Sequence, residues 1–292
     1  MSWIAGFEHI LRENEPLARY TWLRLGGPAR YFAEPTSQEE LQLLVKRASE
    51  NGIPLRLLGS GSNLLVSDAG FPGLVIHLGV ESFGKIERRG NALICGGGAK
   101  LSHLVSIAAR EGLAGLEELV GIPGTVGGAL HGNAGSQHGD IGAWTHSATL
   151  LTETGELVTR TRTQMQFYYR SSSLDELVIL AAQFELEPAN AAEVTKRMQK
   201  NWIVKRAGFP PSTLSQGSVF KDPGGVSAAA IIDEVGLKGL RVGDVQLSDQ
   251  HPNFVIVGQS GTAVDVRELI DTVRRTVNDR LGLQLELGLE IW

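Results

Sequence analysis

The segment from Gly121 to Gly135 contains six glycines in 15 residues and is flanked by apolar stretches. Glycine has no Cβ atom, so a backbone rich in it can adopt positive φ angles and approach a neighbour very closely. Because apolar stretches enclose the segment, it does not read as a flexible linker. We therefore predict an ordered loop whose backbone lies against a flat or extended ligand.

An earlier segment, Leu58 to Leu65, reads Leu-Gly-Ser-Gly-Ser-Asn-Leu-Leu and follows a short apolar run that predicts a buried strand. Its glycines can direct successive N–H groups at one point, which is how a backbone nest binds phosphate oxygens. Alone, the segment is typical of a tight turn between two strands. It is neither a Rossmann fingerprint nor a P-loop, because the third glycine and the Lys-Ser/Thr pair are missing. The two loops lie about 60 residues apart and together suit the two ends of a dinucleotide.

The chain has 292 residues, which at about 100–200 residues per domain predicts two domains. Its 27 basic and 32 acidic side chains give a net charge of −5, which argues against nucleic acid as the main partner. Cys95 is the single cysteine, so an intramolecular disulfide and a cysteine-based zinc site are excluded, and we predict no metal site. No signal peptide and no membrane-spanning apolar run is visible. We therefore expect a soluble, cytoplasmic protein without a membrane partner.

Hydrophobic spacing, caps and breakers predict where helices and strands lie. Helices are predicted at 37–52, 101–111, 189–205, 228–235 and 263–281, with a Gly-Pro-rich break at 208–212. Strands are predicted at 53–58, 74–78, 92–95, 177–186, 254–257 and 283–292, and a hairpin at 147–162 turns at Thr154-Gly155. Helices and strands do not alternate strictly, so the fold class is α+β rather than a doubly wound sheet. We place the two domains at 1–188 and 189–292.

Three segments, Thr21–Ala29, Leu58–Leu65 and Gly121–Gly135, together resemble FAD-binding segments of the UDP-N-acetylenolpyruvoylglucosamine reductase (MurB) family. The resemblance covers nearly the whole chain, from about Thr21 to Trp292. It implies an FAD-binding domain of the PCMH, or vanillyl-alcohol-oxidase, type, followed by a smaller α+β substrate-binding domain. The first loop would bind the FAD pyrophosphate, and the second would line the flavin. The implied cofactor-binding residues are Ser60, Gly61, Ser62, Asn63, Ile122, Gly124, Thr125 and Gly128.

By this resemblance the chain is an NADPH- and FAD-dependent oxidoreductase of peptidoglycan precursor synthesis, a UDP-N-acetylmuramate dehydrogenase. Such an enzyme passes hydride from NADPH through FAD to UDP-N-acetylglucosamine enolpyruvate, giving UDP-N-acetylmuramate. The enolate that forms requires a cation or strong donor nearby, and the adjacent carbon requires a proton donor. Arg170, in the segment 167–173, matches the family's catalytic arginine, and Ser218, in the segment 215–223, matches the serine that delivers the proton.

The same resemblance implies three substrate-binding residues: Tyr169, Lys221 and Gln246. Asp222 stands where the family has an asparagine that contacts phosphate, and an anion there repels a diphosphate unless a neighbouring cation offsets it. Lys205 matches a basic residue that approaches the diphosphate in the family, although the end of a solvated helix is the alternative interpretation. His251 reads as structural rather than catalytic.

The C-terminal strand departs from the family pattern, in which a glutamate assists catalysis. Counting forward from Gly282 places the catalytic position on Gly288, whereas matching a glutamate followed by a β-branched residue places it on Glu290. Glu286, Gly288 and Glu290 share one face of a strand, and the two registers differ by about 6.6 Å along it. We favour Glu290 because a carboxyl group is retained there. Glu286, or no acid at all, is the alternative.

Two other functions stay open from the sequence. Gly288 and Asp222 motivate a degenerate protein that binds FAD or a UDP-sugar without turnover. An oxidase of the same FAD superfamily, with flavin attached to a residue such as His131, is opposed by the Gly-Ser-Val-Phe-Lys segment at 217–221. The 48 positions between Arg170 and Ser218 indicate a compact subclass that lacks a substrate-covering tyrosine insertion. We expect a monomer.

Overall fold

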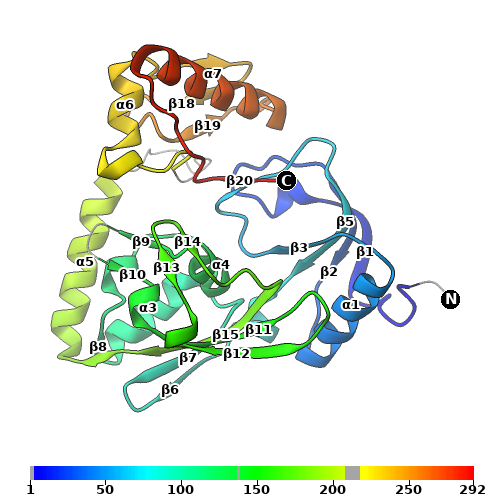
Figure 1. The fold of residues 1–292 in the computed structure, drawn as a ribbon. Coiled ribbons are helices and arrows are strands. Elements are labelled where there is room, and N and C mark those ends of the chain that lie inside the picture. The colour runs from blue at the N-terminus through cyan, green and yellow to red at the C-terminus, as the bar shows by residue number, and fades with distance from the viewer. Residues whose placement is uncertain (1–2, 137–138, 208–217) are drawn as a thin grey trace. The chain divides into compact units, whose positions relative to one another are not determined.

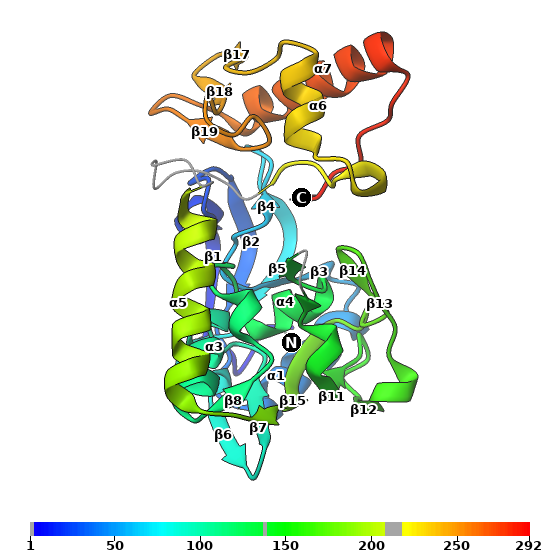
Figure 2. The ribbon, with the colours of Figure 1, turned by 90° about the vertical axis from the view of Figure 1, so that its left-hand side faces the viewer.

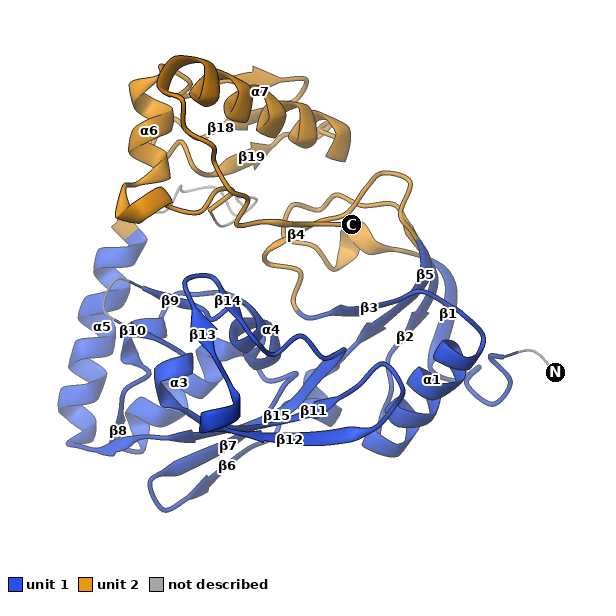
Figure 3. Ribbon diagram, viewed as in Figure 1, with its two compact units in different colours: residues 1–14, 30–59, 72–206 blue, residues 15–29, 60–71, 207–292 orange. Residues whose placement is uncertain are grey.

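The computed structural model describes residues 3–136, 139–207 and 218–292 (Figure 1). Contacts between residues divide the chain into two compact units (Figure 3). Unit 1 comprises residues 1–14, 30–59 and 72–206, and unit 2 comprises residues 15–29, 60–71 and 207–292. This division differs from the predicted boundary at residue 188 in two respects. Unit 2 takes in two early segments, and the helix that follows residue 188 groups with unit 1.

The largest sheet of unit 1 has five antiparallel strands in the order β12-β11-β15-β7-β6. The strands are β6 (Ile86–Arg89), β7 (Ala92–Gly96), β11 (Thr145–Leu151), β12 (Leu157–Thr161) and β15 (Val178–Glu185). The predicted hairpin is confirmed, because β11 and β12 pair from Ser147 opposite Thr161 to Leu151 opposite Leu157.

A second sheet has the order β1-β2-β5-β3. Its strands are β1 (Leu11–Pro16), β2 (Pro28–Ala33), β3 (Leu55–Leu58) and β5 (Phe71–His77), of which β3 and β5 run parallel. Helix α1 (Gln38–Glu50) precedes β3 and buries its apolar stripe. The Ser37 hydroxyl caps α1 by accepting a hydrogen bond from Glu40 N at 3.2 Å. The helix predicted from its cap and spacing is therefore confirmed.

The other elements of unit 1 are shorter or helical. The helices are α2 (Val80–Phe83), α3 (Leu101–Arg110), α4 (Val126–His131) and α5 (Ala191–Ala207), with 3-10 turns at 117–119, 142–144 and 162–164. The short strand pairs are β8 (Leu113–Ala114) with β16 (Glu187–Pro188), β9 (Gly135–Ser136) with β10 (Gly139–Asp140), and β13 (Phe167–Tyr168) with β14 (Ser171–Ser172). Val194 and Met198 of α5 pack with Ala109 and Ala114, so α5 runs beside α3 (Figure 2). This packing explains why α5 groups with unit 1.

Unit 2 is built around one apolar core. Its main elements are α6 (Ala228–Glu234), β17 (Arg241–Val242), β18 (Val245–Leu247), β19 (Val255–Val257) and α7 (Ala263–Leu281), with 3-10 turns at 17–19 and 223–225. The three strands pair antiparallel in sequence order. Buried side chains of the helices and strands form the core, which also contains Val219 and Phe220. The predicted helices at 228–235 and 263–281 and the strand at 254–257 are confirmed.

Helix α7 shows how an early segment becomes part of unit 2. Thr262 and Asp265 form a reciprocal capping box at its N-terminus. In addition, the two carboxylate oxygens of Asp68 accept hydrogen bonds from Ala263 N and Val264 N, both at 3.1 Å. A carboxylate at this end of a helix also interacts favourably with the helix dipole. Residue 68 therefore stabilises a helix that begins almost two hundred positions later in the chain.

The C-terminal segment differs from the single strand predicted over 283–292. Only β20 (Glu290–Ile291) is a strand, and it pairs in parallel with β4 (Leu64–Leu65). Before β20, Gly288 N instead donates to Val219 O at 2.8 Å, so the segment changes its pairing partner at Gly288. A segment that changes partners cannot form one continuous ladder. The predicted break at 208–212 lies outside the described residues.

Candidate active site

The glycine-dense loop at 121–135 is ordered backbone, as predicted. Residues 124–127 bind residues 97–101 of unit 1, through Leu101 N to Gly124 O at 3.0 Å and Gly127 N to Gly97 O at 2.8 Å. Gly124 has a φ of 132°, which favours glycine. The second half forms the short helix α4, which the sequence did not predict because glycines lower helix propensity.

Thr125 links this loop to the other glycine loop within unit 1. Its hydroxyl caps α4 by accepting from Gly128 N at 3.3 Å. A Cβ atom at Gly59 would lie 2.8 Å from the same hydroxyl oxygen, so only glycine fits there. The start of the loop at 58–65 therefore lies directly against the loop at 121–135. This proximity agrees with the prediction that the two loops serve one ligand.

The remainder of the loop at 58–65 belongs to unit 2. Gly61 has a φ of 61°, and a Cβ atom there would lie 2.1 Å from the Tyr20 carbonyl oxygen. Trp22 N donates to Gly61 O at 3.1 Å, which fixes the loop against the segment at 20–22. The Ser60 hydroxyl is buried and has no hydrogen-bond partner among the described residues. A buried hydroxyl without a partner costs free energy. The Ser60 hydroxyl is therefore available to donate a hydrogen bond to a phosphate oxygen.

Asn63 joins the same loop to the C-terminal segment. Its side-chain amide donates to Gly288 O at 2.6 Å, and its backbone carbonyl accepts from Glu290 N at 3.1 Å. The side-chain carboxylate of Glu290 accepts a hydrogen bond from the Trp292 indole at 3.0 Å. The predicted cofactor loop and the predicted catalytic strand are thus neighbours within unit 2.

Ser218 lies on the other side of that C-terminal segment. The next two residues, Val219 and Phe220, are fully buried, and their backbone pairs with residues 286–288. A Cβ atom at Gly288 would lie 3.3 Å from Ser218 O, so Gly288 is the residue of the last segment that lies beside Ser218. In unit 2, Asn63, Ser218 and Glu290 therefore all lie at or beside the backbone of residues 288–290.

The residues after Ser218 have partners that the sequence did not reveal. Lys221 Nζ lies 3.4 Å from the Glu286 carboxylate, and its backbone N–H donates to Glu286 O at 2.9 Å. Asp222 accepts a hydrogen bond from Ala228 N at 2.8 Å at the start of α6. That contact gives the Asp222 carboxylate a structural role at the start of α6.

Arg170 and Tyr169 form the tip of the β13/β14 hairpin in unit 1. Both side chains are exposed, and the Arg170 guanidinium lies 5.8 Å from the centre of the Tyr169 ring. Arg170 has a φ of 58°, a conformation that costs a non-glycine residue about 1–2 kcal/mol. Backbone strain of this kind occurs often, though not only, at functional sites.

Lys205 lies in the neighbourhood of Arg170 within unit 1. Burial lowers the pKa of the Lys205 amine, the Glu118 carboxylate opposes this shift, and the Arg170 guanidinium adds to it. The Lys205 amine also donates a hydrogen bond to the Glu118 backbone carbonyl. Lys205 is therefore not the fully solvated end of a helix, and two cationic side chains of unit 1 influence one another.

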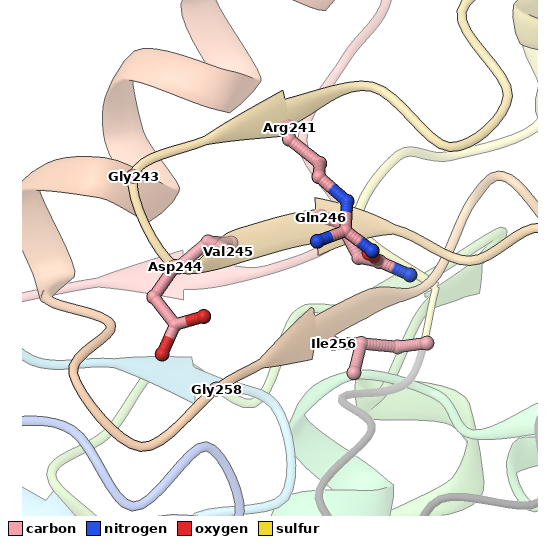
Figure 4. A pocket seen from close by; sticks show the side chains of 7 residues that line it. All are labelled: Arg241, Gly243, Asp244, Val245, Gln246, Ile256 and Gly258. Carbon is pink, nitrogen blue, oxygen red and sulfur yellow. The ribbon is translucent and has the colours of Figure 1, made fainter.

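Gln246 lies on the outer face of the sheet in unit 2. It pairs with Arg241 on β17 and with Ile256 on β19, whereas its neighbours Val245 and Leu247 are buried in the core. Arg241, Gln246 and Ile256 line a pocket, and Figure 4 shows the polar ends of Arg241 and Gln246 directed the same way. Arg241 was not predicted as a site residue, although it lies only five positions before Gln246.

Comparison with known proteins gives matches over both parts of the chain. Residues 29–161 match the family model of an FAD binding domain, and residues 210–292 match that of the UDP-N-acetylenolpyruvoylglucosamine reductase C-terminal domain. UDP-N-acetylenolpyruvoylglucosamine reductase of Rhodopirellula baltica is 41% identical over 97% of this chain and 93% of its own length. That of Moorella thermoacetica is 40% identical over 96% and 92%.

The chain belongs to the UDP-N-acetylenolpyruvoylglucosamine reductase (MurB) family. The crystal structure of the family member from Thermus caldophilus superimposes with a TM-score of 0.84 at 38% identity, covering 97% of this chain and 99% of that one. The predicted family and the predicted fold class, an FAD-binding domain followed by a smaller α+β domain, are confirmed. Among the described residues, no helix has the length and apolar character that a membrane span requires, and no group of three or more His, Cys, Asp or Glu side chains is placed to hold a metal ion.

Proposed function

We propose that this chain is an NADPH- and FAD-dependent reductase that converts UDP-N-acetylglucosamine enolpyruvate to UDP-N-acetylmuramate in peptidoglycan precursor synthesis. The observation that carries the proposal is the cluster in unit 2, where Gly288 of the last segment is hydrogen-bonded both to Asn63 of the loop and to Val219, the residue next to Ser218. Relatives that carry the reductase name over nearly their whole length favour this function over a degenerate binding protein.

The glycine loops fit FAD. The Ser60 hydroxyl has no partner among the described residues and can donate a hydrogen bond to a phosphate oxygen. Gly59 has no Cβ atom, so its backbone can lie close against the Thr125 side chain. FAD bound there would supply the hydride-carrying group between NADPH and the substrate. We assign the pyrophosphate to Ser60, Gly61, Ser62 and Asn63, and the flavin to Ile122, Gly124, Thr125 and Gly128. One N–H of the Asn63 side-chain amide is used by Gly288 O, which leaves its second N–H, its side-chain carbonyl and its backbone for the cofactor.

Arg170 and Ser218 would act on the enolpyruvyl group. A guanidinium stays charged and can bind two carboxylate oxygens, so Arg170 would stabilise the negative charge that develops on the enolate. The Ser218 hydroxyl would donate the proton to carbon. Tyr169, Lys221 and Gln246 would bind the substrate, with Lys221 as a cation beside the Asp222 carboxylate.

The C-terminal acid would be Glu290. We favour Glu290 because it lies two positions after Gly288, the residue beside Ser218, and because its backbone N–H is bound to Asn63 O. Glu286 is paired with Lys221 and is the alternative. Loss of a general acid typically costs about 10²–10⁴ in rate. Glu290→Gln should therefore lower kcat by about that factor, whereas Glu286→Gln should not.

The test is steady-state NADPH oxidation by the FAD-loaded protein, with and without UDP-N-acetylglucosamine enolpyruvate. Substrate-dependent oxidation is the expected result. FAD binding without substrate-dependent turnover would instead support the degenerate binding protein. Equal loss of rate in Glu286→Gln and Glu290→Gln would contradict the assignment of the acid.

Two predictions about the protein as a whole also belong to this proposal. We expect a monomer, which light scattering of the FAD-loaded protein would test, and a dimer would contradict it. We expect the protein in the cytoplasm, where NADPH is available. Fractionation of cells that produce the full chain would test the location.

A further inference from the structure

The hairpin that carries Arg170 has little apolar anchoring. Tyr168, Tyr169 and Arg170 are exposed, and only Phe167 among the strand residues is packed against the unit 1 core. The two strands contribute two residue pairs, Phe167 with Ser172 and Tyr168 with Ser171. A two-stranded hairpin of this length is not stable alone, and the left-handed conformation of Arg170 adds cost. Other contacts must therefore hold the tip in place.

Asn133 supplies the most direct of these contacts. It follows α4, is 4% exposed and has a φ of 42°. Its side-chain amide donates to Tyr168 O at 2.9 Å, two residues before Arg170. Its side-chain carbonyl accepts from Gly142 N at 3.1 Å. Asparagine suits this place because it tolerates positive φ and carries a donor and an acceptor on one planar group.

Gly142, whose N–H is bound by the Asn133 side-chain carbonyl, also contacts the hairpin. A Cβ atom at Gly142 would lie 2.3 Å from the Phe167 ring, so the ring rests directly on that glycine. Asn133 thus fixes the hairpin twice, through the Tyr168 carbonyl and through the surface on which Phe167 packs. Both hydrogen bonds are made by a buried side chain. Losing either one would leave a buried polar group without a partner, which is costly.

Two weaker hydrogen bonds also connect the end of α4 to the hairpin and the residues that follow it. The Ser172 hydroxyl donates to His131 O at 3.0 Å, and His131 Nδ1 lies 3.1 Å from Leu174 O. These bonds start from the end of α4, as Asn133 does. Ser172 is half-buried rather than buried, so its link is exchanged with water more easily. Among these links, the amide of Asn133 contacts the backbone nearest to Arg170.

We propose that Asn133 is a positioning residue for Arg170: it locks the β13/β14 hairpin so that the guanidinium is presented in one orientation to an anionic substrate group. This inference rests on the proposed function, because it assumes that Arg170 acts on the substrate carboxylate or enolate. It adds a residue that makes no contact with substrate and acts through the Tyr168 carbonyl. Misplacement of a catalytic group by about 1 Å can cost about 10²-fold in rate.

The test uses Asn133→Asp in the FAD-loaded full chain. Aspartate keeps the acceptor for Gly142 N but places an oxygen against Tyr168 O, so it breaks the hairpin bond selectively. We expect kcat to fall about 10- to 100-fold while KM changes less than about threefold. In single-turnover measurements, reduction by NADPH should be unchanged and only substrate-dependent reoxidation should slow. Hydrogen exchange of a peptide covering residues 166–173 should become faster.

Asn51→Asp is the matched control. Asn51 also lies in unit 1 and donates its side-chain amide to a backbone carbonyl, Arg47 O, at 2.8 Å, but it does so at the exposed end of α1. The same chemical change there should leave kcat and exchange in 166–173 unaltered. If Asn133→Asp does not fold, Asn133→Gly takes its place, because glycine keeps the positive φ and removes both bonds.

A double variant separates this inference from the proposed function. In an Arg170→Ala background, Asn133→Asp should lower kcat by less than about twofold, because the group that it positions is gone. If Asn133→Asp lowers kcat in the Arg170→Ala background by the same factor as in the wild type, the positioning role is overturned. Wild-type turnover by Arg170→Ala alone would overturn the role of Arg170 in the proposed function. A normal reoxidation rate in Asn133→Asp, with Arg170→Ala impaired, would overturn the inference and leave the proposed function intact.

Discussion

The segments that carry Arg170 and Ser218 are held by different forces, although each depends on a buried asparagine. In unit 1, Asn133 binds the hairpin at Tyr168, and the hairpin itself is largely exposed. In unit 2, Asn253 is 2% exposed and binds both the N–H and the carbonyl of Phe220, each at 2.9 Å. Phe220 is itself 1% exposed and belongs to the core.

The difference indicates how rigidity is obtained in each place. The Ser218 segment is anchored by apolar burial, and the asparagine satisfies polar groups that burial would otherwise leave unpaired. The Arg170 hairpin is largely exposed and has few apolar contacts, so it depends on hydrogen bonds. We therefore expect changes near Ser218 to affect mainly stability, and changes near Arg170 to affect mainly rate.

The largest expected effect is that of Phe220→Ala. Truncation of a fully buried phenylalanine typically costs about 3–5 kcal/mol, so the free energy of unfolding should fall by that amount. Phe167→Ala in the hairpin should cost about 1–2 kcal/mol, because its ring is only partly buried. Urea unfolding followed by circular dichroism measures both. Equal costs would show that the two segments are anchored alike.

Arg170→Gly should separate rate from stability. Loss of one preorganised donor to a developing anion typically costs about 10²–10³ in kcat. Glycine adopts a φ of 58° without strain, so the free energy of unfolding should stay unchanged or rise by up to about 1 kcal/mol. Steady-state kinetics and urea unfolding test the two parts. A destabilised Arg170→Gly would show that the arginine side chain anchors the hairpin.

Asn253→Asp provides the counterpart to Asn133→Asp. The carboxylate keeps an acceptor for Phe220 N but leaves Phe220 O unpaired in a buried place, which typically costs about 1–3 kcal/mol. Unfolding should therefore become easier, with hydrogen exchange accelerated across unit 2. A loss of kcat without a loss of stability would place Asn253 in the same class as Asn133 and remove the contrast between the two segments.

Much of the fold was predictable because its signals are local. Helix α1 has a serine cap, an acidic first turn and apolar residues at helical spacing, so the prediction of 37–52 needed no tertiary information. The glycine loops were also recognised from composition alone. Their packing was not, because the need for Gly59 beside Thr125 and for Gly61 beside Tyr20 arises from segments far apart in the chain.

The errors have the same origin. The last segment reads as one strand over 283–292, but it changes partners at Gly288, and a change of partner leaves no mark on apolar spacing. Helix α4 is short and glycine-rich, so its Thr125 cap was the only local signal. Arg170 and Ser218 are proposed as site residues through resemblance to a family. The residues that hold their segments, Asn133 and Asn253, are 35 and 33 positions from their partners and could not be found from spacing.

The smallest expected effect is a pH dependence confined to unit 2. Burial lowers the pKa of His251 from its ordinary value, and the nearby Asp222 carboxylate opposes this shift in part. His251 lies two positions before Asn253, and its ring packs edge-on against Phe254 at 4.7 Å. The unfolded chain, with a histidine pKa of about 6.5, therefore binds a proton before the folded chain does as the pH falls.

Stability should consequently be fully present above the unfolded pKa and decline as the pH falls below it towards the lowered folded pKa. We expect the free energy of unfolding to be lower at about pH 5.5 than at about pH 7.5, and His251→Gln to reduce this difference. His103→Gln, at an exposed histidine of unit 1, is the control for loss of an imidazole. The hairpin bond joins the Asn133 side-chain amide to the Tyr168 carbonyl, and neither group titrates, so protection from hydrogen exchange in 166–173 should depend less on pH than protection in 218–221. If protection in 166–173 and in 218–221 is lost together as the pH falls, after correction for the intrinsic pH dependence of exchange, the two segments are coupled, and the contrast between a hydrogen-bonded hairpin and a buried segment does not hold.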